Sequence, residues 1–181
     1  MNQNNLSPAF DKKNTLLLPV DPALIDLEPI QKLAAVNGFT KKDEFHITIV
    51  GFKNGRLIQQ ALDQLTDEQL SEVGRQIQIL LDQTNWHFTF TPQYYEITKE
   101  YLQPGSNKKE LRQAYIQMLQ LPGLETFYNR FNKILNLDSE TPLGHITLYT
   151  KSTDPKKKRR GIDVGSRKNF ESLKPRLLNL S

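Results

Sequence analysis

The stretch Phe45-His46-Ile47-Thr48-Ile49-Val50-Gly51-Phe52 decides the fold, and Gly144-His145-Ile146-Thr147-Leu148-Tyr149-Thr150 repeats its pattern. Both stretches alternate and are rich in β-branched residues, so each predicts a β-strand. Residues two positions apart on a strand point to the same face. Each strand therefore presents a histidine and a threonine side by side. The aliphatic residues beside them point the other way, toward a core: Ile47, Ile49, Ile146 and Leu148.

Strands and helices alternate along the rest of the chain. Further strands are expected at 15–20 and 86–91, with 94–98 as a continuation or hairpin partner and 162–164 as a short addition. Apolar spacing predicts helices at 29–36, 69–83, 108–121 and 124–135, and a C-terminal helix from residue 169 that is interrupted at Pro175. This order predicts an α+β fold, with α/β as the alternative, and hints at two lobes of similar build. We expect a flexible N-terminal tail over residues 1–14 and a single domain over 15–181.

Composition narrows the class of protein. The chain of 181 residues has no cysteine, which excludes disulfides, thiolate metal sites and a cysteine nucleophile. It shows no signal-peptide pattern and no apolar run long enough to cross a bilayer, so we expect a cytoplasmic protein that makes no membrane contact. The net charge of +4 favours an anionic partner such as a nucleic acid or a nucleotide, although ordinary solubility charge explains it equally well.

The three histidines are the candidates for catalytic residues. Each is followed two residues later by threonine, at His46-Ile47-Thr48, His87-Phe88-Thr89 and His145-Ile146-Thr147. Histidine exchanges protons near neutral pH, so one imidazole can act as general base and another as general acid. Threonine hydroxyls can donate hydrogen bonds to phosphate oxygens. We therefore take His46 and His145 as catalytic and Thr48 and Thr147 as phosphate-binding, with no metal or cofactor required. The alternative is a pair of ordinary half-buried strand histidines.

The paired motifs Phe45-His46-Ile47-Thr48-Ile49 and Gly144-His145-Ile146-Thr147-Leu148 resemble those of the 2H phosphoesterases, the superfamily of RNA 2′,3′-cyclic phosphodiesterases and 2′–5′ RNA ligases. The resemblance implies a bilobal α+β fold with two pseudo-symmetric halves around a central cleft. It implies a metal-independent mechanism in which one histidine is base and the other acid. It also implies substrates with a 2′-linked phosphate: 2′,3′-cyclic RNA ends, cyclic nucleotides, cyclic oligonucleotides or 2′–5′ linkages. In many members proline directly precedes the second histidine, and an arginine follows closely; here Pro142 lies three residues earlier and the nearest basic residue is Lys151.

Other residues are candidates for substrate contact: His87, Tyr95, Tyr149 and Lys151. Trp86, Tyr94, Tyr95 and Tyr149 can stack on a base or serve as core packing. His87 can face the cleft or lie on a solvated strand face, and a zinc site of three histidines is a further alternative. The run Lys156–Arg160 fits RNA attraction, a nuclear localisation patch or a solvated loop, and Lys41 and Lys42 are similarly ambiguous.

The sequence thus leads to three functional hypotheses. The first is a monomeric, cofactor-free phosphodiesterase acting on a 2′,3′-cyclic phosphate or a related 2′-linked or cyclic oligonucleotide, with the assignment of base and acid left open. The second is a non-catalytic module that binds RNA ends or nucleotides in the same cleft. The third is an interaction protein in which the triplets are incidental.

Overall fold

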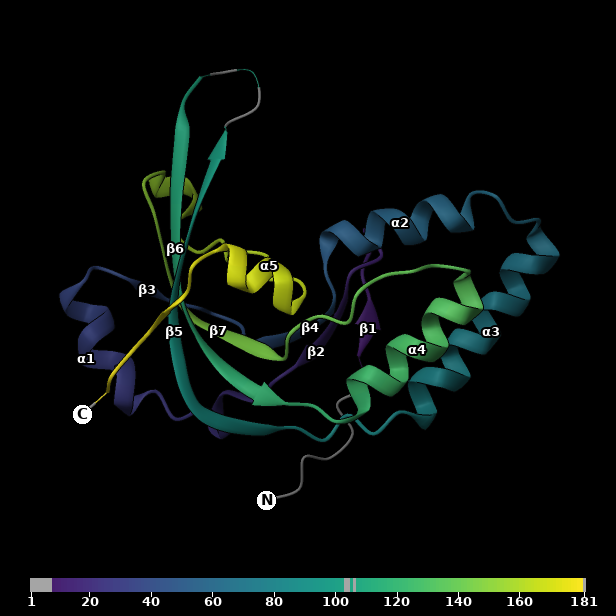
Figure 1. Cartoon of the computed structure of the whole chain (residues 1–181), viewed down its shortest axis with the longest axis horizontal. Coiled ribbons are helices and arrows are strands. Elements are labelled where there is room, and N and C mark those ends of the chain that lie inside the picture. The colour runs from purple at the N-terminus through teal and green to yellow at the C-terminus, as the bar shows by residue number, and fades with distance from the viewer. Residues whose placement is uncertain (1–7, 103–104, 106, 181) are drawn as a thin grey trace.

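The computed structural model describes residues 8–102, 105 and 107–180, and these form an α+β fold (Figure 1). Its strands build one antiparallel sheet in the order β1-β2-β4-β7-β6-β5-β8, with β3 pairing on β7. The strands are β1 (Ala9–Phe10), β2 (Leu16–Pro19), β3 (Thr40–Lys41), β4 (His46–Val50), β5 (Thr89–Leu102), β6 (Lys109–Gln120), β7 (His145–Ser152) and β8 (Arg176–Leu177). The helices are α1 (Glu28–Val36), α2 (Phe52–Leu62), α3 (Asp67–Gln83), α4 (Gly123–Leu135) and α5 (Arg167–Ser172), with 3₁₀ turns η1 (Pro22–Leu24) and η2 (Pro155–Lys157).

The two strands that carry the triplets, β4 and β7, are neighbours within this sheet. Their aliphatic residues face the core as expected, since Ile47, Ile49, Ile146 and Leu148 are fully buried in the main hydrophobic cluster. That cluster also takes side chains from α1, α2, α3 and α4. A smaller cluster contains Ile116 and Met118, which pair with Thr147 and His145 and so share their face of the sheet. The histidine face is therefore partly covered by its own apolar cluster.

The helix expected at 108–121 is wrong, because this segment is the strand β6, paired with β5 on one side and β7 on the other. Its apolar residues Leu111, Tyr115, Met118 and Leu119 follow a helical spacing, which led to the error. A strand covered on both faces loses its polar alternation, and residues 114–119 are all buried. A short apolar run of this kind fits either structure by periodicity alone.

Other elements also differ from expectation. Gly51 follows the last residue of β4 and is the N-cap of α2, a helix that the sequence analysis missed. Residues 86–88 precede β5, and this strand runs through Pro92 with a register shift between Phe90 and Tyr94, the kind of bulge at which a strand accepts proline. Residues 162–164 form no regular strand.

The expected N-terminal tail joins the fold within its described part. Ala9–Phe10 pair with β2 as the edge strand β1, and the amide nitrogens of Lys13 and Thr15 donate to the carboxylate of Asp11. Residues 1–7 of that tail lie outside the described residues. The turn at Lys13 and Asn14 packs on α2, where a Cβ added at Gly55 would lie 2.6 Å from the Lys13 carbonyl oxygen.

The expected helices at 29–36, 69–83 and 124–135 are confirmed, and α3 begins with a capping box formed by Thr66 and Gln69. The C-terminal segment is also helical, as α5, and becomes β8 after Pro175.

Two helical glycines provide a test of this packing. Gly74 in α3 has nothing within 4 Å of an added Cβ, so Gly74→Ala should raise the free energy of unfolding by about 1 kcal/mol through helix propensity. Gly55→Ala in α2 gains the same propensity but places its methyl group against two backbone carbonyls, so we expect a net loss of roughly 1–3 kcal/mol. Urea unfolding measures both, and a stabilised Gly55→Ala variant would contradict the docking of residues 11–15 on α2.

Candidate active site

One pair of residues sets the geometry of the site. Ile47 of β4 lies directly opposite Ile146 of β7 in the antiparallel ladder. The flanking residues therefore meet across the two strands, His46 beside Thr147 and Thr48 beside His145, all on the face opposite the isoleucines. Electrostatic coupling between His46 and His145 agrees with this proximity. The structure thus brings all four predicted residues into one group, called here the His–Thr cluster (His46, Thr48, His145, Thr147).

His145, the first residue of β7, is oriented by a backbone carbonyl just before the strand. Its Nδ1 lies 2.8 Å from the carbonyl oxygen of Leu143, and since a carbonyl only accepts, Nδ1 carries the proton. In neutral His145, Nε2 is then the acceptor. Burial lowers the pKa of His145 below its ordinary value, against the opposing influence of the Leu143 hydrogen bond and the Asp163 carboxylate. Gly144 permits this position, because a Cβ there would lie 2.8 Å from the Leu119 carbonyl oxygen.

His46 is half-buried at the start of β4. Burial lowers its pKa most, the positive charge of Lys42 lowers it further, and His145 adds a third contribution, while Glu44 acts in the opposite direction. Because burial lowers the pKa of both histidines, it favours the neutral form of both imidazoles in the unliganded protein. A bound anion between them would favour protonation of one ring.

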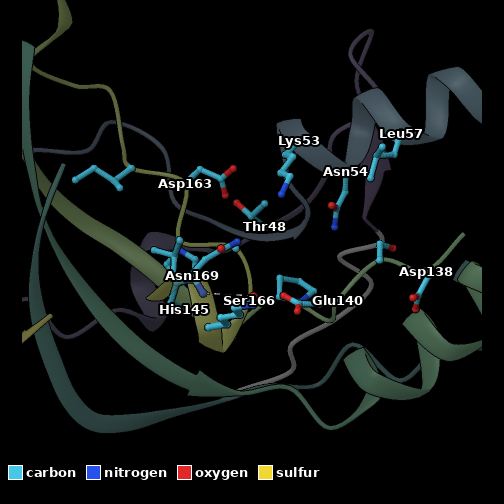
Figure 2. Close-up of a pocket in the computed structure, with 17 residues that line it drawn as sticks. Thr48, Lys53, Asn54, Leu57, Asp138, Glu140, His145, Asp163, Ser166 and Asn169 are labelled. Carbon is cyan, nitrogen blue, oxygen red and sulfur yellow. Dashed lines mark hydrogen bonds between the residues drawn. The ribbon is translucent and has the colours of Figure 1, made fainter. Parts of the chain in front are cut away.

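A polar cavity of about 370 Å³ opens beside this cluster, with His145 and Thr48 on its wall (Figure 2). Its rim and walls come from the first turn of α2, the segment before β7, and the segment leading into α5. Figure 2 shows Lys53 and Asn54 pointing from α2 into it, with Asp163 on the opposite side. The full lining comprises Thr48, Gly51, Lys53, Asn54, Leu57, Asp138, Ser139, Glu140, Pro142, His145, Ile162, Asp163, Val164, Gly165, Ser166, Lys168 and Asn169. His46 and Thr147 do not line it, so the cavity lies at the Thr48–His145 end of the cluster.

The sequence analysis did not identify most of the polar residues that line the cavity. Lys53 and Asn54 depend on α2, whose signal was present as Ile58 and Leu62 at helical spacing after Gly51. Ser166 accepts a hydrogen bond from the Asn169 amide as the N-cap of α5. No local pattern linked these residues to the histidines, because only the sheet topology brings them together.

Tyr149 and Lys151 lie apart from the His–Thr cluster. The register of β6 against β7 shifts so that Ile116 pairs with Thr147 but Tyr115 pairs with Tyr149. The extra residue at this bulge breaks strict alternation, and Tyr149 is buried with Tyr115 in the main cluster. The Lys151 Nζ donates to the carbonyl oxygen of Asn37, 2.9 Å away, at the end of α1.

The remaining aromatic and histidine candidates also lie outside the cavity lining. His87 is exposed before β5 begins. Tyr95 packs edge-on against Phe170 in the smaller cluster, and Tyr94 is buried in the main one. Trp86 packs on Phe127 of α4 and donates its indole N–H to the Leu81 carbonyl oxygen. These contacts favour packing over base stacking for Trp86 and Tyr94.

Within the described ranges, no group of three or more His, Cys, Asp or Glu side chains is placed to hold a metal ion, so the three histidines form no zinc site there. No helix in the described part of the chain has the length and apolar character needed to cross a membrane. Comparisons with protein-family models, curated proteins and solved structures found no match to the chain.

We expect the free energy of unfolding to fall as the pH is lowered below 6.5. The pKa of His145 is lowered in the folded protein, so the unfolded chain takes up a proton that the folded chain does not, and acid favours unfolding. His145→Asn keeps a donor for the Leu143 carbonyl oxygen but does not titrate, so its stability should depend less on pH in this range. Urea unfolding at several pH values measures both proteins, and equal slopes would contradict a buried neutral His145.

Proposed function

We propose that this protein is a metal-independent phosphodiesterase that hydrolyses a 2′,3′-cyclic phosphate or a related 2′-linked or cyclic oligonucleotide phosphodiester. The observation that carries the proposal is the Ile47–Ile146 pairing, which sets two imidazoles and two hydroxyls on one face of the sheet. The adjoining polar cavity, with Lys53 and Asn54 on its wall, offers space and hydrogen-bonding groups for the nucleoside part of such a substrate.

The proposed mechanism uses only the side chains of the His–Thr cluster. The phosphate lies between the imidazoles, and the hydroxyls of Thr48 and Thr147 donate to its non-bridging oxygens. One imidazole takes a proton from the attacking water as the new P–O bond forms. The other gives a proton to the ribose oxygen as the P–O bond to that oxygen breaks. The two histidines exchange these roles for the reverse reaction.

The lowered pKa values bear on this proposal because an acid must begin protonated. The negative charge of the bound phosphate raises the pKa of an adjacent imidazole and so favours its protonated form, while the other ring stays neutral. Repulsion between the two rings opposes double protonation, as the influence of His145 on the pKa of His46 indicates. Substrate binding thereby creates the acid–base pair from two neutral rings.

The proposal includes the two-lobed architecture that the resemblance implies. The order of elements supports it, since β2–α1–β4–α2 and β6–α4–β7–α5 each run strand, helix, strand, helix, apart from the short β3. In each unit the two strands pair antiparallel, and β4 and β7 meet at the centre. Each unit then contributes one histidine and one threonine.

A non-catalytic nucleotide-binding module is the second candidate. The lowered pKa of both rings favours it, because binding alone requires no proton donor. Such a module would bind nucleotides in the cavity and release no product.

Histidine variants test the proposal. We expect turnover of 2′,3′-cyclic nucleotides in excess EDTA, with a bell-shaped pH profile, and a loss of about 10²- to 10⁴-fold in kcat for His46→Ala or His145→Ala. His87→Ala is the matched control and should keep wild-type activity, since His87 is exposed and lies outside the cavity lining. Product formation that survives in both variants would refute the mechanism, and nucleotide binding without turnover in the wild type would favour the binding module.

The threonine hydroxyls are tested by a change that keeps side-chain shape. Thr48→Val and Thr147→Val should each lower kcat by about 10²-fold, the usual effect of removing one donor to a developing charge. Thr89→Val, on the exposed start of β5, serves as the control. Steady-state kinetics at the pH optimum measure kcat and KM for each variant. A change confined to KM would mean that the hydroxyls bind substrate without stabilising the transition state.

A further inference from the structure

The basic run Lys156–Arg160 lies in a loop (residues 154–161, the basic loop) that is fastened to the sheet by one inward lysine. Lys157 Nζ lies 3.2 Å from a carboxylate oxygen of Glu110 on β6 and 3.1 Å from one of Asp154. Glu110 is only 1% exposed and also accepts from Arg112 and from the Ser152 hydroxyl. A buried carboxylate of this kind requires such partners, so the contact fixes the loop in place.

The other basic side chains of the loop point outward. Lys156, Lys158, Arg159 and Arg160 are exposed, and Arg159 pairs with Asp43. No carboxylate in the described part of the chain forms an ion pair with Lys156, Lys158 or Arg160. Hydrogen bonds hold the backbone of the loop in place. The carbonyl oxygen of Lys158 accepts from Thr150 Oγ1 at 2.7 Å, and that of Arg159 accepts from Lys42 Nζ at 2.9 Å. The loop is thus a fixed cluster of positive charge, which favours a polyanionic partner.

The basic loop adjoins one end of the His–Thr cluster. Lys42, which contacts the Arg159 carbonyl oxygen, is close enough to His46 to lower its pKa. A Cβ added at Gly161 would lie 3.8 Å from the Thr147 hydroxyl oxygen. Positive charge therefore lies at the His46–Thr147 end, while the polar cavity lies at the Thr48–His145 end.

We infer that the substrate is a single-stranded oligonucleotide whose reacting 2′-linked phosphodiester lies within the strand, so that additional phosphates on one side of it lie on the basic loop. The inference rests on the proposed function and narrows its substrate class. The reacting phosphate occupies the His–Thr cluster and one nucleoside occupies the cavity. A terminal 2′,3′-cyclic phosphate leaves no phosphate on the far side of the cluster, whereas a strand that crosses the cluster through an internal 2′–5′ linkage places its next phosphates beside Lys158 and Arg160. Neutralising them releases counterions and strengthens binding.

The test compares 2′–5′-linked oligoribonucleotides of two, four and eight nucleotides, of which the dinucleotide has only the reacting phosphate. We expect the wild type to prefer the longer substrates by about 10-fold or more in kcat/KM at low salt, mainly through KM. The double variant Lys158→Glu, Arg160→Glu should abolish most of that preference. A matched double variant of exposed basic residues on α4, Arg130→Glu, Lys133→Glu, makes the same change in net charge and should retain it.

A binding measurement separates failure of this inference from failure of the proposed function. Fluorescence anisotropy with a 2′–5′-linked octanucleotide, measured in the His145→Ala background to prevent turnover, should show affinity that falls with salt. The loop variant should reduce the slope of log affinity against log salt concentration by about 1.4, about 0.7 for each phosphate contact removed. If no substrate is hydrolysed but this difference holds, the proposed function fails and the binding surface stands. A length preference and salt slope equal in the wild type and the loop variant would overturn the inference, as would transfer of the effect to the α4 variant.

Discussion

The pairing of Ile47 with Ile146 is the contact on which the rest of the site depends. A shift of one residue in strand register turns every side chain to the other face. Here such a shift would bury the imidazoles in the main cluster and expose four aliphatic residues that are now fully buried. The free energy of burying those residues, roughly 1.5–3 kcal/mol each, therefore fixes the position of the proposed catalytic groups. Core packing and site geometry have a common cause.

The surroundings of this contact differ at its two ends. At one end His145 is buried, donates to the Leu143 carbonyl oxygen and lines the polar cavity. At the other, half-buried His46 lies near Lys42 and the basic loop. Two triplets identical in sequence thus occupy unequal environments. The asymmetry comes from the segments outside the sheet centre, since α2 and α5 wall the cavity and the loop after β7 supplies the charge.

The sequence was most informative where one local rule acts alone. The His–Thr triplets, the amphipathic helix α4 and the capping box of α3 could be predicted because strand alternation, helical spacing and end capping each depend on neighbouring residues. It was misleading for β6, where burial on both faces removes the alternation that marks a strand. The bulge opposite Tyr115 and Ile116 turned Tyr149 away from the site, and no feature of Tyr149 itself signals it. The residues of the cavity wall could not be predicted, because only long-range strand pairing brings α2 and α5 together.

The position of β7 in the sheet has a consequence for biosynthesis. This strand joins the N-terminal unit β1-β2-β4 to the hairpin β5–β6, and it follows β4 by about a hundred residues. During translation, β4 leaves the ribosome long before β7. Until β7 pairs with it, one edge of β4 has unpaired backbone groups and can pair wrongly with another strand. Closing so long a loop is slow. The two histidines therefore come together only after β7 has been synthesised, so a nascent or truncated chain that lacks β7 has no assembled site.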